Sequence, residues 1–171
     1  MFSRLFLTRL IFGLFFSQTV FAADVETQLL MSLCNLQGGQ IVQNWTCPNS
    51  GKVRSGAFCV VKNQQGQEQV YNGCSHSIGD GGTKFFPACV LHDLCYHNEP
   101  QVNHRSKDQC DQMFYENMKS ICAKEKDSGS CRTLAWTFYQ AVAGFGSSSW
   151  SCAKNAVPYT DSMEQLLTGL N

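Results

Sequence analysis

The sequence predicts a mainly α-helical, disulfide-rich fold, and three observations lead to this prediction. Apolar helical patterns follow Pro87, only one short region favours β-structure, and all ten cysteines lie after residue 22. An even number of cysteines behind a leader segment indicates five disulfides formed in an oxidising compartment. A zinc site would favour cysteine pairs separated by two residues, and the chain has none. We therefore expect a small helical domain held together by disulfides.

Residues 1–22 have the features of a secretory signal peptide. Arg4 and Arg9 precede the apolar run 10–16, and small residues precede the expected cleavage point. The apolar run is too short to span a bilayer comfortably, which makes an uncleaved anchor the weaker alternative, and no later stretch is a candidate transmembrane helix. We expect a secreted protein, extracellular or periplasmic depending on its source, with a single domain over 23–171.

The charge balance argues against nucleic acid as a partner. Without Arg4 and Arg9, the chain keeps 11 of its 13 basic residues and all 13 acidic ones, a net charge of −2 with histidine neutral. No basic stripe appears along the sequence, so the electrostatic footprint of a nucleic-acid-binding protein is absent.

Hydrophobic spacing and turn residues divide the chain into predicted elements. Ser106 and Gln109 form a capping-box pattern that should begin one of the long helices. The expected elements, in order, are a helix over 24–36, a candidate β-hairpin formed by 58–61 and 69–71, a glycine-rich loop over 72–87, and helices over 87–98, 107–122 and 131–146.

His92 and Asp111 are the first candidates for a chemical role. At about 100° of rotation per residue, His92 shares one helix face with Asp93 and Tyr96. On the next helix, Asp111 lies in a stripe of otherwise apolar and aromatic residues. A connection of roughly ten residues makes the two helices antiparallel neighbours, so that the His92 face can meet Asp111.

This arrangement points to a definite chemistry. Asp111 can accept a hydrogen bond from one imidazole nitrogen of His92, which leaves the other nitrogen as a base for water. Asp93 points away from that pair toward the glycine-rich loop, where backbone carbonyls add the hard oxygens that calcium prefers. Activated water beside a calcium ion fits ester hydrolysis without a covalent intermediate, and no serine-nucleophile motif competes with it.

Three stretches of the chain resemble one known family. CVLHDLCY begins at Cys89, CDQMFYENM begins at Cys110, and NGC begins at Asn72. They resemble the two helix signatures and the start of the calcium loop of the secreted phospholipase A2 superfamily, in its atypical branch of group XII-like and microbial or fungal forms. The match covers about 72–122, and the remainder is similar only in helix and cysteine content.

The resemblance implies a role for each matched side chain. His92 would be the general base, Asp111 its partner, Asp93 the calcium ligand, and Tyr96 would support Asp111 through its hydroxyl. The implied activity is calcium-dependent hydrolysis of the sn-2 acyl ester of glycerophospholipids in membranes or micelles.

The resemblance also implies calcium-loop ligands and two disulfides. Counting back from His92 gives carbonyls near Asn72, Cys74 and His76, whereas the atypical forms favour Asn72 and Gly73. The implied disulfides are Cys74–Cys89 and Cys95–Cys110. A further bridge of the family is absent here, because Ala88 and Asn117 occupy its two positions.

Alternatives remain open from the sequence. The domain could be a weakly catalytic or non-catalytic toxin or binding module of the same fold, or a structural disulfide-rich protein. Phe85 and Phe86 could contact membrane or pack inside, and Leu29, Leu30 and Leu33 could line a lipid entrance or fill the core. The remaining histidines, His76, His97 and His104, are expected to be exposed. Asp80 is expected to be a turn residue, with calcium ligation as the alternative.

Overall fold

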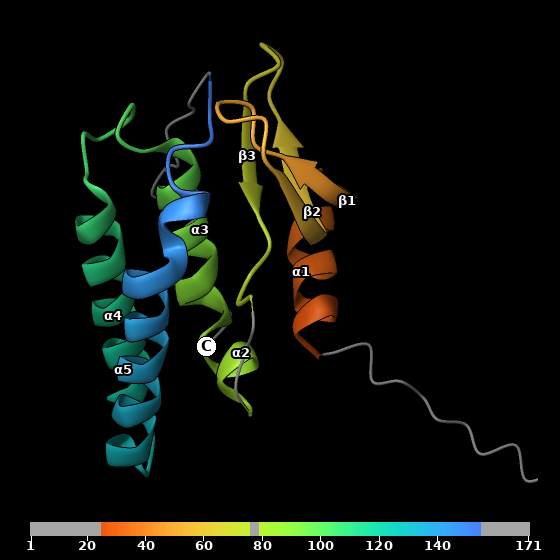
Figure 1. The fold of residues 1–171 in the computed structure, drawn as a ribbon. Helices are drawn as coiled ribbons and strands as arrows, with labels where there is room; N and C mark the ends of the chain where they lie inside the picture. The colour runs from red at the N-terminus through yellow and green to blue at the C-terminus, as the bar shows by residue number, and fades with distance from the viewer. Residues whose placement is uncertain (1–24, 76–78, 155–171) are drawn as a thin grey trace, which may run out of the picture.

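The computed structural model describes residues 25–75 and 79–154. Three long helices stand side by side in one half, and a small sheet with the N-terminal helix forms the other half (Figure 1). The signal peptide expected at 1–22 lies outside the described residues. The elements are α1 (Val25–Leu36), β1 (Gln40–Thr46), β2 (Val53–Lys62), β3 (Glu68–Tyr71), α2 (Gly81–Lys84), α3 (Phe86–Asn98), α4 (Lys107–Cys122), α5 (Ser128–Phe145) and the short 3₁₀ helix η1 (Gly146–Ser149).

The helical half follows the sequence closely. Pro87 lies in the first turn of α3, where its missing N–H removes no helical hydrogen bond. The side chain of Ser106 accepts from the Gln109 amide, and the Gln109 side chain accepts from the Ser106 amide, so the predicted capping box of α4 is confirmed. One apolar cluster joins the helices, and its largest buried members are Phe85, Phe114, Met118 and Phe138.

The three strands form one antiparallel sheet in the order β1-β2-β3. The hairpin between β2 and β3 was predicted, although β2 extends further at both ends. Strand β1 was not predicted, because its sequence QIVQNWT is half polar and none of its residues is fully buried. Asn44 adopts a positive φ of 58° where the register of β1 shifts against β2.

Helix α1 closes the core between the sheet and α3. Leu30 and Leu33 are buried among residues of β2, β3 and α3, so these two leucines fill the core. Gly39 follows α1 at a point of close approach, since a Cβ there would lie 2.8 Å from the Cys59 Sγ atom. The chain therefore turns tightly from α1 into β1 against the Cys34–Cys59 disulfide.

All ten cysteines are paired, which confirms the prediction of five disulfides. At the candidate site, Cys74–Cys89 joins α3 to the loop after β3, and Cys95–Cys110 joins α3 to α4. Cys47–Cys152 has the largest sequence separation, 105 residues. The pairs are Cys34–Cys59, Cys47–Cys152, Cys74–Cys89, Cys95–Cys110 and Cys122–Cys131.

Some local expectations were wrong, and the causes are local as well. The short helix α2 interrupts the predicted loop after residue 80, and α5 begins at Ser128 because the Asp127 side chain caps the Ser130 amide.

Phe85 and Phe86 are both buried, so they pack inside. No helix within 25–75 or 79–154 combines the length and the apolar composition needed to cross a bilayer.

Candidate active site

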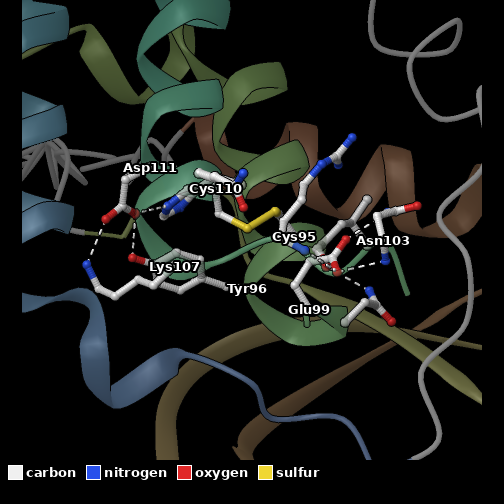
Figure 2. The surroundings of a disulfide bond; sticks show 12 residues. Cys95, Tyr96, Glu99, Asn103, Lys107, Cys110 and Asp111 are labelled. Carbon is white, nitrogen blue, oxygen red and sulfur yellow. Dashed lines mark hydrogen bonds and ion pairs between the residues drawn. A yellow bond between two sulfur atoms is a disulfide. The ribbon is translucent and has the colours of Figure 1, made fainter. Parts of the chain in front are cut away.

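The structure brings His92 and Asp111 together between neighbouring helices. The His92 Nε2 atom on α3 lies 2.9 Å from the Asp111 Oδ1 atom on α4, and both side chains are buried. The Cys95–Cys110 disulfide joins the same two helices one residue away from Asp111 and three from His92. The disulfide and the polar pair therefore fix the same helix contact. Figure 2 shows the Cys95–Cys110 disulfide beside Asp111.

The Asp111 carboxylate receives two further donors. The Tyr96 hydroxyl donates to Oδ1 at 2.5 Å, and the Lys107 ammonium donates to Oδ2 at 2.7 Å; Figure 2 shows both side chains turned toward the carboxylate. Lys107 also donates to the backbone carbonyls of Val142 and Ala143, at 3.2 Å each. This lysine thereby connects α4 to the end of α5 and holds the carboxylate in one orientation.

The hydrogen bonds decide the charge state of this cluster. Burial by itself would raise the pKa of Asp111, but hydrogen bonds from His92, Lys107 and Tyr96 outweigh it and hold that pKa below its usual range. Burial lowers the pKa of His92, and the positive charge of Lys107 lowers it further, against the opposing pull of Asp111. The site therefore favours a neutral imidazole facing an ionised carboxylate.

The second nitrogen of His92 is left available for chemistry. Nδ1 has no hydrogen-bond partner among the described residues. The ring stacks on Phe114 with its centroid 4.6 Å away and lies beside the Tyr96 ring, with 4.1 Å between centroids. These aromatic walls restrict the ring orientation while His92 still lines the cavity described below.

Asp93 belongs to a separate site, where α3 meets the loop that follows β3. Its Oδ2 atom accepts the backbone N–H groups of Asn72 and Gly73, at 2.8 and 2.9 Å. Gly73 has a φ of 78°, and a Cβ there would lie 2.8 Å from the Phe86 ring, so this turn requires glycine. Burial raises the pKa of Asp93 to about 7, although the two N–H groups oppose the shift.

The residues around Asp93 fit a hard divalent cation. Its Oδ1 atom accepts no hydrogen bond from the described residues, which leaves one carboxylate oxygen as a ligand. The described residues contain no group of three acidic, histidine or cysteine side chains suited to a metal, and backbone carbonyls of the Asn72–Cys74 segment are suitable further ligands for calcium. Cys74 is disulfide-bonded to Cys89 and can offer only its carbonyl. His76 lies outside the described residues.

The His92–Asp111 site and the Asp93 site open into one cavity of about 890 Å³. Its lining includes His92 and Asp93 on α3 and the loop from Asn72 to Ser75. Apolar side chains of the sheet and of α5 form opposite walls; they are Trp45, Phe58 and Val70 on one side and Phe138, Ala141, Val142 and Phe145 on the other. A long apolar ligand with one polar end would fit this composition.

Several residues near the site were missed or misjudged from the sequence. Lys107 precedes Asp111 by four residues, a helical spacing that brings lysine and aspartate together and could have identified it. Glu26 carries no comparable signal, yet it is buried and its carboxylate lies 3.6 Å from where a Gly73 Cβ would be. His97 was expected to be exposed, and this was wrong: it is 3% exposed, lines the cavity and packs edge-on against Trp45.

The comparison with known families assigns the chain. The family model of prokaryotic phospholipase A2 matches residues 52–146, which is more than half of the chain. The chain belongs to the prokaryotic phospholipase A2 family. No curated protein and no solved structure matches it. The matched range contains both helices of the His92–Asp111 pair and the loop that faces Asp93.

Proposed function

We propose that the protein is a secreted, calcium-dependent phospholipase A2 that hydrolyses the sn-2 acyl ester of glycerophospholipids. The observation that carries this proposal is the 2.9 Å contact between His92 and Asp111 at the edge of a largely apolar cavity. A neutral histidine oriented by an ionised carboxylate is suited to take a proton from water. Family membership supports the same class of reaction.

The proton transfers can be assigned to atoms of this chain. His92 Nδ1 removes a proton from a water molecule, whose oxygen attacks the ester carbonyl. Asp111 stabilises the resulting imidazolium through Nε2, and Tyr96 and Lys107 keep the carboxylate in place. The imidazolium then returns its proton to the departing glycerol oxygen, so that a free fatty acid and a lysophospholipid leave the site.

Asp93 and the backbone carbonyls of the Asn72–Cys74 segment would hold calcium. Calcium bound there supplies positive charge that stabilises the oxyanion formed from the ester carbonyl. The chain itself contributes a preformed turn: the N–H groups of Asn72 and Gly73 fix one oxygen of Asp93 and leave the other for the ion. Family membership supports calcium as the cofactor.

Secretion is supported by disulfide content. Five disulfides in a chain of 171 residues require an oxidising compartment, which agrees with the signal peptide expected at 1–22. Lipid is supported as the substrate because the cavity walls are apolar on both sides of the His92 ring.

The deciding experiment measures fatty-acid release from mixed phosphatidylcholine and phosphatidylglycerol vesicles, with calcium and with excess chelator. Release that requires calcium supports the whole proposal. Equal release in chelator contradicts the calcium mechanism. No release under either condition, together with vesicle binding, favours a non-catalytic lipid-binding module of the same fold.

A further inference from the structure

The cavity that contains His92 also contains two cationic side chains without carboxylate partners. Lys52 and Arg54 both line it, and neither forms an ion pair with any described residue. Asp93 is the one carboxylate in the described lining. A largely apolar cavity with unpaired positive charge favours a ligand that is apolar along most of its length and anionic at one point.

Arg54 is the better placed of the two. It lies on β2 opposite Trp45 in the sheet register and is half-buried, whereas Lys52 is exposed. Its guanidinium donates to the hydroxyl of Ser149 in η1, on the opposite side of the cavity. Since a guanidinium has five N–H donors and this partner is neutral, most of its hydrogen-bonding capacity and all of its charge remain for a ligand.

Arg54 lines the same cavity as the loop and carboxylate proposed to hold calcium. The loop is Asn72–Ser75 and the carboxylate is that of Asp93, with which Arg54 forms no ion pair. A ligand that fills the cavity can therefore contact Arg54, Asp93 and His92, because all three residues line it.

A purely structural role for Arg54 is less well supported. The end of β1 is already joined to the C-terminal segment by the Cys47–Cys152 disulfide, and the Asn49 amide donates to the Cys152 carbonyl at 3.0 Å. One further hydrogen bond to the partly buried Ser149 adds little to that connection. The disulfide and the Asn49 hydrogen bond therefore hold these two segments together without help from the half-buried guanidinium of Arg54.

We propose that Arg54 binds the phosphodiester of the substrate and so positions the neighbouring ester beside His92. This inference rests on the proposed phospholipase function. In a glycerophospholipid the phosphate and the central ester are attached to adjacent glycerol carbons, so a fixed phosphate restricts where the ester can lie. A planar guanidinium matches two phosphate oxygens at once, which a lysine ammonium does not.

The test compares two soluble substrates with identical acyl groups: dibutyryl phosphatidylcholine, which carries the phosphate, and dibutyrylglycerol, which does not. For Arg54→Gln we expect the ratio of kcat/KM on the first substrate to kcat/KM on the second to fall about tenfold to a hundredfold. Arg54→Lys should recover part of the ratio. Ser149→Ala and Lys62→Gln should leave it unchanged, because the first keeps the guanidinium and the second removes a cation of β2 outside the cavity lining.

Binding of a non-hydrolysable short-chain diether phosphocholine, followed by calorimetry, separates this inference from the proposed function. Weaker binding by Arg54→Gln supports the phosphate site even if the wild-type protein releases no fatty acid. An unchanged substrate ratio, an equal loss on both substrates, or the same loss in Ser149→Ala overturns it. Inorganic phosphate that binds as tightly as the diether lipid would also overturn it, because the site would then recognise free phosphate.

Discussion

His92 and Tyr96 both contact the same oxygen of Asp111, at 2.9 and 2.5 Å, while Lys107 holds the other oxygen at 2.7 Å. Both oxygens of the carboxylate are therefore held by side-chain donors of the protein. Since the three donors come from two helices joined by a disulfide, the geometry of the pair is set by the fold before any ligand binds.

Replacement of the proposed base gives the first prediction. His92→Gln should reduce kcat for fatty-acid release about a hundredfold to ten-thousandfold, because no group remains to take the proton from water. Far-ultraviolet circular dichroism and thermal unfolding should still show a folded protein. His104→Gln is the matched control, since His104 is exposed and outside the cavity lining. Activity of His92→Gln close to that of the wild type would contradict the assignment.

Asp93 should determine the response to calcium. In thermal unfolding, calcium at about a hundred times its dissociation constant should stabilise the wild-type protein by about 2.7 kcal/mol. Asp93→Asn should lose this stabilisation together with activity, because the carboxylate ligand is gone. Asp80→Asn should retain both, since Asp80 is an exposed residue paired with Lys84. A loss in Asp80→Asn alone would place the ion elsewhere.

The raised pKa of Asp93 makes the effect of calcium dependent on pH. With a folded pKa of about 7 and an ordinary value of 3.8, the folded state binds more protons than the unfolded state between these values. Stability without calcium should therefore fall as pH rises through that range. Calcium binds the carboxylate and releases the proton, so its stabilising effect should grow as pH rises toward and above about 7. A calcium-induced shift in Tm that is independent of pH would contradict this linkage.

Lys107 should set the acidic limb of the pH–rate profile. Activity requires neutral His92, whose pKa is lowered from 6.5 chiefly by burial and further by Lys107. Removal of this positive charge in Lys107→Met should raise that pKa and shift the acidic limb of kcat/KM to higher pH. Asp111→Asn should shift it the other way, because Asp111 favours the protonated ring. A limb that stays in place in both variants would show that another group titrates.

A substitution at Gly146 tests whether Tyr96 supports Asp111, because it changes the surroundings of Tyr96 and leaves the carboxylate unaltered. A Cβ at this position would lie 2.5 Å from the Tyr96 hydroxyl oxygen, so Gly146→Ala should displace Tyr96, destabilise the fold by about 1–3 kcal/mol and lower activity. Gly144→Ala is the control, because nothing lies within 4 Å of its Cβ and α5 should gain about 0.5–1 kcal/mol from alanine. Equal activity and stability for the two variants would contradict the contact.

The helices could be predicted because their signals are local. The capping box at Ser106 defines the first turn of α4, and the apolar periodicity of α3 and α4 depends on residues within a few positions of each other. The facing of His92 and Asp111 followed from helix phase and a short connection. Strand β1 could not be identified, because its partial burial comes from pairing with β2.

The polar residues outside the motifs could not be predicted because their surroundings come from distant parts of the chain. Arg54 lines the cavity because η1, about 95 positions later in the sequence, lies next to it in the fold. His97 is buried because Trp45 of β1 covers it, and no pattern around His97 encodes that contact. The spacing of Lys107 and Asp111 was visible in the sequence, but the carbonyls of Val142 and Ala143 that hold the lysine were not.

The Cys47–Cys152 disulfide sets an order of events during biosynthesis. His92, Asp93 and Asp111 are all synthesised before Cys152, and a covalent link between the end of β1 and the segment after η1 forms only when that last cysteine pairs. A nascent or reduced chain thus carries every reactive group of the site before this covalent link exists. Covalent closure at this end of the cavity needs the complete, oxidised chain, and so a compartment in which disulfides form.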